Sequence, residues 1–275
     1  MKEKFIKFKN YKISLWEDGK GQPVILLHGL GASKEWWKYN FPFLSKHFKV
    51  IVPDIIGFGH SDKPEISYNL DLANNFLNSL IESFNFHKVS LIGNSMGRLI
   101  SLYFALNFPD RLNKLVLVSN AGFSRNLSLI LRIATIYPVG EFALSLANYK
   151  TVNLLLRSIF YDKSKIPEEL VHKVLDILKL KNSKKILLEI LRYGVNLKGL
   201  HPLIYKSILK NISKFEIPTL IIWGKEDKII PLSQAKLGHK LIKNSHLFIF
   251  EKCGHLPQIE YKNKFNQLVL DFLLE

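Results

Sequence analysis

A glycine-flanked serine segment, residues 93–97 with the sequence GNSMG, constrains the fold of this 275-residue chain more than any other feature. It directly follows an apolar run at residues 89–92 and directly precedes a helix-like stretch at residues 98–107. A serine on such a sharp strand-to-helix turn adopts a strained backbone conformation that exposes its hydroxyl at the end of a sheet, and only small neighbours leave room for it. The segment therefore predicts a nucleophile elbow, with Ser95 as the nucleophile.

Two later segments contain the groups that a serine nucleophile needs. A serine hydroxyl reacts near neutral pH when a base, normally a histidine, takes its proton and a carboxylate orients that histidine. Asp227 lies on a loop after the apolar run 219–223, and His255 lies on a loop after another strand-like run. The sequence thus predicts a catalytic triad of Ser95, Asp227 and His255, with Glu226 as the fallback acid.

A glycine-rich loop near the N-terminus is the candidate oxyanion hole. The sequence HGLG at residues 28–31 follows an apolar strand, and a tetrahedral intermediate needs preorganised donors for its negative oxygen. We expect the backbone N–H groups of Leu30 and Met96 to be the two donors. Gly29 and Gly31 would let the backbone turn toward the substrate.

Together these motifs resemble those of the α/β-hydrolase superfamily, from about residue 10 to the C-terminus. The motifs are HGLG, DIIGFGHS at residues 54–61, GNSMG, and the WGKED and CGHLPQIE segments near residues 223 and 253. The resemblance implies a mostly parallel central sheet flanked by helices, with a helical cap inserted in the chain. Asp54, in the second motif, is expected to form local hydrogen bonds in its turn rather than to act in catalysis.

Strand-like and helix-like patterns divide the chain into a core and a cap. Residues 1–120 and 204–275 are predicted to form the α/β core, and residues 121–203, where strand patterns stop, the cap. The first two strands alternate apolar and polar residues, as in an antiparallel edge hairpin, whereas later ones are continuous apolar runs typical of buried parallel strands. The predicted strands span residues 4–8, 11–16, 24–28, 49–53, 88–93, 114–119, 219–223 and 246–251.

Apolar residues of the cap are candidates for the substrate pocket. Such residues either line a pocket above Ser95 or pack the cap onto the core, and a roof over the elbow favours a small hydrophobic substrate over a polymer. One cap helix is expected to open at Pro167 with two acidic residues. The residues predicted to bind substrate are Gly29, Leu256, Ile133, Ile136, Tyr137 and Phe142.

The charge balance is basic: 39 Lys and Arg residues against 23 Asp and Glu residues give a net charge of +16. The basic residues are scattered and no nucleic-acid-binding motif is present, so we expect a solvated basic surface. This leaves open a weak attraction to anionic lipids or substrates. Secretory-signal and membrane-spanning patterns are absent, and a single cysteine excludes an internal disulfide. These features predict a cytoplasmic protein without stable membrane insertion, and they leave its oligomeric state open.

The function expected first is hydrolysis of small hydrophobic carboxylic esters through an acyl-enzyme, without metal or cofactor. An alternative is carbon–carbon bond hydrolysis of aromatic ring-cleavage products, because GNSMG and the following cap resemble that branch. Those relatives usually have a tryptophan after the histidine and a second glycine after the elbow, where this chain has Leu256 and Arg98. A ligand-binding receptor or a cofactor-free peroxidase on the same scaffold is a third interpretation.

Overall fold

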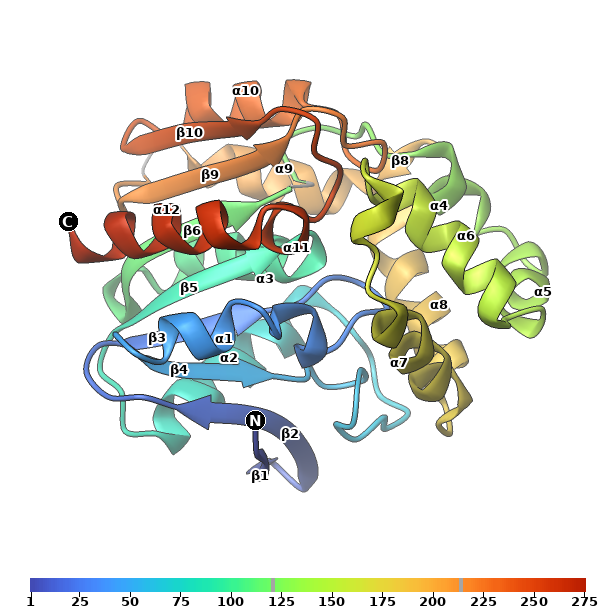
Figure 1. Cartoon of the computed structure of the whole chain (residues 1–275), viewed down its shortest axis with the longest axis horizontal. Helices are drawn as coiled ribbons and strands as arrows, with labels where there is room; N and C mark the ends of the chain where they lie inside the picture. The colour runs from blue at the N-terminus through green and yellow to red at the C-terminus, as the bar shows by residue number, and fades with distance from the viewer. Residues whose placement is uncertain (120–121, 213–214) are drawn as a thin grey trace.

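A central sheet with helices on both faces forms the core of the computed structural model, which describes residues 1–119, 122–212 and 215–275 (Figure 1). The strand order is β1-β2-β4-β3-β5-β6-β9-β10. Only β1 with β2 and β2 with β4 pair antiparallel within this sheet, so the predicted edge hairpin and mostly parallel sheet are confirmed. All eight predicted strands are present: β1 (Glu3–Phe8), β2 (Tyr11–Asp18), β3 (Pro23–Leu27), β4 (Lys49–Pro53), β5 (Val89–Asn94), β6 (Leu112–Val118), β9 (Thr219–Gly224) and β10 (Ser245–Phe250).

The central strands are continuous apolar runs because both of their faces are covered. In β6, Leu115 and Leu117 pack into the apolar layer beneath the helices on one face, and Val116 and Val118 pack into the layer on the opposite face. Side chains alternate along a strand, so a strand segment with both faces covered is apolar at successive positions. One helix layer contains α2 (Leu70–Ser83), α3 (Met96–Asn107), α9 (Pro202–Asn211) and α10 (Ser233–Leu241), and the other α1 (Phe41–Leu44), α11 (Pro257–Glu260) and α12 (Lys262–Leu274).

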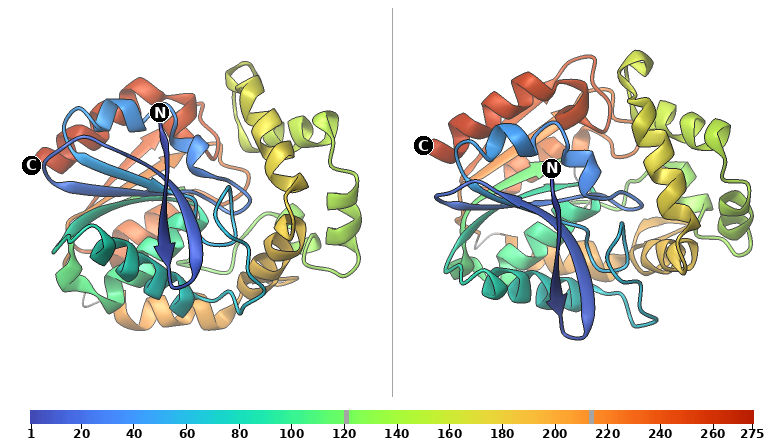
Figure 2. Two further views of the ribbon diagram at one scale, coloured as in Figure 1. Left: turned by 90° about the horizontal axis from the view of Figure 1, so that it is seen from below. Right: turned by 60° about the horizontal axis from the view of Figure 1, so that its bottom comes forward.

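A group of helices between β6 and α9 forms the cap. It lies beside the core, at the end opposite the C-terminus, in both further views of the molecule (Figure 2). Glu168 and Glu169 occupy the first turn of a helix that Pro167 precedes, as predicted. The cap contains α4 (Leu129–Ile133), α5 (Val139–Ser145), α6 (Tyr149–Ile159), α7 (Glu168–Lys179), α8 (Ser183–Gly194) and the short strands β7 (Val195–Asn196) and β8 (Gly199–Leu200).

Of the two predicted boundaries of the cap, only the second lies within the described residues. The boundary at residues 120 and 121 lies outside the described residues. The boundary after residue 203 cuts through α9, which begins at Pro202 and packs against α3 through buried Ile204 and Ile208. Proline at the first position of a helix is preorganised for it, and the apolar face of α9 then continues the core. Within the described residues, no helix combines the length and apolar character that crossing a bilayer requires.

Candidate active site

Ser95 occupies the sharp turn between β5 and α3. Its φ of 53° and ψ of −114° place it in a strained region, and its N–H donates to the Val118 carbonyl at 3.0 Å. A Cβ atom at Gly97 would lie 2.3 Å from the Leu27 carbonyl oxygen, and one at Gly93 would lie 2.5 Å from the backbone of Arg98. Both glycines are therefore required by close backbone approach, which is the reason expected from the sequence.

Arg98 stands where the resemblance to ring-cleavage hydrolases led us to expect a glycine, yet α3 runs without interruption from Met96. The Arg98 side chain is fully buried, and its guanidinium lies 4.4 Å from the ring centroid of Phe123. A planar guanidinium stacks well on an aromatic face, so the larger side chain is accommodated beside the elbow.

Asp227 and His255 come together from the ends of β9 and β10. The carboxylate Oδ2 of Asp227 lies 2.7 Å from Nδ1 of His255, and its Oδ1 accepts backbone N–H groups of Ile229 and Ile230 at 2.8 and 3.0 Å. An ionised carboxylate only accepts hydrogen bonds, so Nδ1 carries the proton and Nε2 is left as the base. The His255 N–H donates to the Ile159 carbonyl at 2.8 Å, which fixes the loop against α6.

Glu226, the fallback acid, has a different role. Its carboxylate accepts the N–H of Cys253 at 2.8 Å, and its own N–H donates to the Cys253 carbonyl at 3.0 Å. These bonds join the two loops that carry Asp227 and His255. Cys253 itself is buried, and burial raises the pKa of its thiol, which disfavours the reactive thiolate.

The HGLG loop lies directly against the serine. A Cβ atom at Gly29 would be 3.2 Å from Cβ of Ser95. Nε2 of His28 accepts the Ile55 N–H at 3.0 Å, so Nδ1 carries the proton and donates to the Gly29 carbonyl at 2.8 Å. Burial lowers the pKa of His28, which keeps the ring neutral and holds this tautomer.

A largely apolar cavity of about 250 Å³ lies beside the elbow, the HGLG loop and the histidine loop. Ser95 and His255 line it together with Gly29 and the predicted donors Leu30 and Met96. Among the described residues that line it, none is Lys, Arg, Asp or Glu. The cap covers the cavity mainly through Leu127, Ile130, Leu131, Leu155, Ile159 and Ile190.

A family model described as the alpha/beta hydrolase fold matches residues 22–261, which is most of the chain. The chain belongs to the α/β-hydrolase family. Its carboxyl-end loops hold Ser95, Asp227 and His255 in the serine–acid–histidine order of that family. For such open α/β sheets, the carboxyl ends of the strands are where ligands bind.

Three relatives illustrate the range of similar hydrolases. A 2-hydroxy-6-oxo-6-(2'-aminophenyl)hexa-2,4-dienoic acid hydrolase of Metapseudomonas resinovorans is 30% identical, over 98% of this chain and 90% of that protein. A meta-cleavage product hydrolase from Pseudomonas fluorescens is 27% identical with a TM-score of 0.85, over 98% and 97% of the two chains. A bacterial membrane phospholipase A is 25% identical with a TM-score of 0.83, over 99% and 85%.

Four predicted pocket residues of the cap lie outside the cavity of this α/β-hydrolase. Ile133, Ile136, Tyr137 and Phe142 are exposed over 36–77% of their surface and are not among the described lining residues. The residues of α4 that line the cavity are instead Ile130 and Leu131. Because this part of the sequence is apolar at most positions, periodicity could not tell which face turns inward.

Leu256 also lies away from the cavity, whereas Gly29 lines it as predicted. Leu256 precedes α11, is fully buried, and packs in an apolar cluster with Trp36, Phe160 and Leu170 where core and cap meet. Its role in the structure is thus packing at the base of the cap. Related enzymes with tryptophan at this position would place a larger side chain there.

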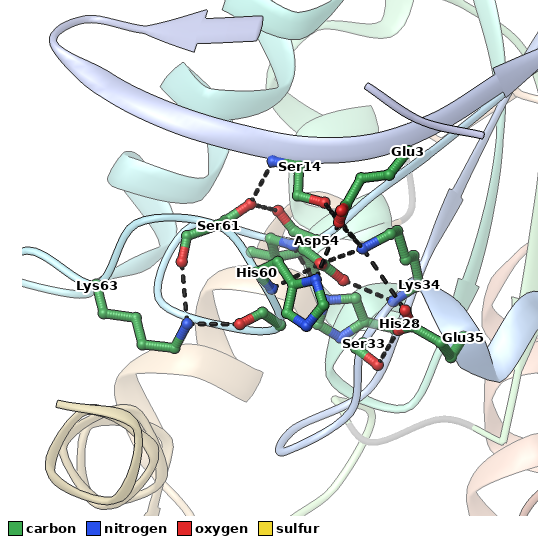
Figure 3. A network of polar contacts seen from close by, with 12 residues as sticks. Glu3, Ser14, His28, Ser33, Lys34, Glu35, Asp54, His60, Ser61 and Lys63 are labelled. Atoms are coloured by element: carbon green, nitrogen blue, oxygen red, sulfur yellow. Dashed lines mark hydrogen bonds and ion pairs between the residues drawn. The ribbon is translucent and has the colours of Figure 1, made fainter. Parts of the chain in front are cut away.

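A buried ion pair behind the HGLG loop was not expected from the sequence (Figure 3). Lys34 is 1% exposed, and its Nζ donates to Asp54 at 2.8 Å, Glu3 at 2.9 Å and Ser14 at 2.8 Å. Burial opposes its charge, but Asp54 and Glu35 raise the pKa of Lys34 above the usual value. The carboxylate of Asp54 also accepts the backbone N–H groups of Lys34 and His60, at 2.7 and 2.8 Å.

This ion pair supports the loop beside Ser95. Asp54 precedes Ile55, whose N–H holds His28, and Lys34 opens the short helix η1 (Lys34–Trp37) directly after the loop. Asp54 therefore forms the hydrogen bonds expected in its turn and extends them to the loop. As for metals, no three His, Cys, Asp or Glu side chains gather into a metal site in the part of the chain that the structure describes.

Proposed function

We propose that this protein is a serine hydrolase of small, largely apolar carbonyl compounds. Ser95 attacks the carbonyl carbon, Nε2 of His255 takes its proton, and Asp227 holds the histidine tautomer. The N–H groups of Leu30 and Met96 stabilise the oxyanion. The observation that carries the proposal is the 2.7 Å contact of Asp227 with a histidine that shares an apolar cavity with Ser95.

The reaction to test first is hydrolysis of a carbon–carbon bond beside a ketone. The names of similar proteins support this choice, since they act on 2-hydroxy-6-oxo-dienoates. Water adds across the bond: the ketone carbon ends as a carboxylic acid, and the departing carbon takes a proton. Conjugation in a dienoate spreads the negative charge on the departing carbon, and His255 would supply its proton.

Ester hydrolysis is the second candidate, and the cavity favours it. A dienoate carries a carboxylate, and the described residues lining the cavity include no Lys or Arg to pair with it. Burying a neutral polar group without a hydrogen bond costs on the order of 2–7 kcal/mol, and burying an unpaired carboxylate costs more. An uncharged ester avoids this penalty, and the similar phospholipase A is an ester hydrolase by name.

A parallel assay separates these functions. The purified protein and Ser95→Ala are assayed with two substrate series. The first is dienoates with a methyl or phenyl group on the ketone, whose hydrolysis is measured by loss of absorbance. The second is p-nitrophenyl esters from acetate to laurate. Multiple turnovers on dienoates that vanish in Ser95→Ala support carbon–carbon hydrolysis. Turnover of esters alone assigns an esterase and shows how deep the pocket is.

Activity that survives in Ser95→Ala would contradict the serine mechanism for either substrate. If neither substrate class is turned over, the hydrolase proposal fails for them. A thermal shift of the protein by the same compounds would then point to ligand binding without turnover, and a halide-dependent reaction with peroxide would point to a cofactor-free peroxidase.

A further inference from the structure

The outer helices of the cap expose large apolar side chains to solvent. These residues come from α4, the turn before α5, the end of α5 and α6, which group on one side of the molecule away from both termini (Figures 1 and 2). We call them the cap patch: Leu129, Ile130, Tyr137, Leu146, Leu154 and Leu155, exposed over 45–77% of their surface. Exposed apolar patches of this kind usually mark an interaction surface.

Two residues of the cap patch also line the cavity. Ile130 and Leu155 are 54% and 45% exposed, yet both line the cavity that contains Ser95. These two residues therefore lie at the mouth of the cavity, one on α4 and one on α6. An apolar phase in contact with the patch would be continuous with the route to the serine.

The charges around the patch indicate which partner it fits. Between residues 129 and 159 the single acidic residue is Glu141, and both of its carboxylate oxygens accept hydrogen bonds from Arg192, at 2.7 and 2.8 Å. Lys150 and Arg157 are basic and exposed on α6, between and beside the apolar residues. Exposed apolar side chains with exposed cations on the same helix are complementary to an anionic lipid surface.

The same charges argue against a second copy of the chain as the partner. Each copy carries a net charge of +16, and pairing through the cap patch would bring Lys150 and Arg157 of both copies into one interface. Like charges brought together across an interface oppose association. The same cations that would repel one another between two copies attract an anionic surface.

We propose that the cap patch docks the protein on the surface of an anionic bilayer, with the cavity mouth facing the acyl chains. Apolar substrates then reach Ser95 from the lipid. The contact is peripheral, since no helix in the described residues is suited to span a membrane. This inference goes beyond the proposed hydrolysis, because docking requires no turnover.

Cosedimentation with vesicles tests the proposal. The full-length protein is mixed with vesicles of phosphatidylcholine alone or with phosphatidylglycerol. We expect binding that needs phosphatidylglycerol and weakens as salt is raised. Leu154→Ser should weaken binding, whereas Leu274→Ser, at the opposite end of the molecule, should not; the two leucines are 69% and 65% exposed, so the pair is matched.

Two combined variants separate the apolar and electrostatic parts. Leu129→Ser with Leu146→Ser and Leu154→Ser should weaken binding by about tenfold. Lys150→Glu with Arg157→Glu should remove the preference for phosphatidylglycerol. Neither set lines the cavity, so hydrolysis of a water-soluble substrate should be unchanged and serves as the check that the variants fold.

Three outcomes would overturn the docking proposal. They are absence of binding by the unchanged protein, equal binding by the triple variant, and concentration-dependent dimers that the triple variant abolishes, which would make a second copy the partner. Vesicle binding by a protein inactive on both substrate classes would instead refute the proposed hydrolysis alone.

Discussion

The contact between Asp227 and His255 determines which imidazole nitrogen can act on Ser95. With Nδ1 committed to the carboxylate at 2.7 Å, only Nε2 can take the proton of the serine. The Asp227 side chain has no solvent exposure, so water cannot substitute for it. The backbone bonds from Ile229 and Ile230 to its other oxygen keep the carboxylate aligned with the ring.

Asp227→Asn should therefore lower kcat by on the order of 10³- to 10⁴-fold, because the amide favours the wrong histidine tautomer. Thermal unfolding should change little, since the amide oxygen can still accept the two backbone N–H groups. Steady-state kinetics on whichever substrate is turned over measures the effect. Glu226→Gln is the control, and a comparable loss of kcat in that variant would mean that the acid has been misassigned.

The elbow glycines make a prediction about stability. Gly97→Ala should lower the free energy of unfolding by about 1–3 kcal/mol or more, because the new methyl would meet the Leu27 carbonyl at 2.3 Å. Gly194→Ala is the matched control: its nearest neighbour would be 3.8 Å away, and alanine suits the end of α8. Urea unfolding of the two variants should differ in sign or size; equal destabilisation would contradict the close approach.

At the scale of elements, one buried carboxylate joins the cap to the histidine loop. Glu260, in α11, is 4% exposed and accepts the N–H of Gly254 at 2.7 Å and those of Tyr161 and Asp162 at 3.0 Å. Gly254 precedes the histidine, and Tyr161 and Asp162 follow α6. The end of α6 and the loop of His255 thus share one side chain.

Glu260→Gln should lower the free energy of unfolding by about 1–3 kcal/mol near neutral pH, because an amide N–H would face backbone N–H donors. It should also lower kcat, since the His255 loop loses part of its support. Glu251→Gln is the control, because Glu251 forms an exposed ion pair with Lys225. A stable Glu260→Gln with unchanged kcat would show that α6 and the loop are held by other contacts.

The same side chain gives a pH dependence. Burial raises the pKa of Glu260 above its usual value of 4.5, despite three opposing N–H donors. The folded state then binds this proton more tightly than the unfolded chain does. Its contribution to stability is complete below pH 4.5 and is lost as the pH rises through the raised pKa. Unfolding midpoints across that range should fall more steeply for the unchanged protein than for Glu260→Gln, and parallel curves would contradict the raised pKa.

At the scale of the whole molecule, the cavity exists only because the cap lies over the carboxyl ends of the strands. Its floor carries Ser95 and the loop residue Leu30, and its roof comes from α4, α6 and α8. Substrate size is therefore decided by how two parts of the chain fit, rather than by either part alone.

Ile130→Trp, at the mouth, should lower kcat/KM for long acyl or aryl substrates by about tenfold and leave short ones nearly unchanged. Ile133→Trp, three residues on but outside the described cavity lining, should leave the substrate-size profile unchanged. A chain-length series of substrates measures both variants. An equal effect of the two tryptophans would mean that the mouth lies elsewhere on α4.

Features that are encoded by neighbouring residues could be predicted from the sequence. Apolar runs and alternation indicated the sheet strands because each strand carries its own burial pattern. The elbow, the HGLG loop and the loops of Asp227 and His255 were found because their turn chemistry lies within a few consecutive residues.

Other features depend on residues far apart in the chain and were decided only by the tertiary structure. The buried ion pair of Lys34 needs Glu3, Ser14 and Asp54 from separate parts of the chain. Glu260, in α11, accepts a hydrogen bond from Tyr161, which follows cap helix α6.

The sequence by itself determined the strands, the elbow and the order of the candidate triad, because each follows from neighbouring residues. Only the tertiary structure decided which face of the cap turns inward, placing Ile130 at the cavity and Tyr137 in solvent. Both positions are apolar and lie on the same stretch of chain. Burial is a property of the partner surface, and a chain segment that is apolar on every side carries no information about where that partner lies.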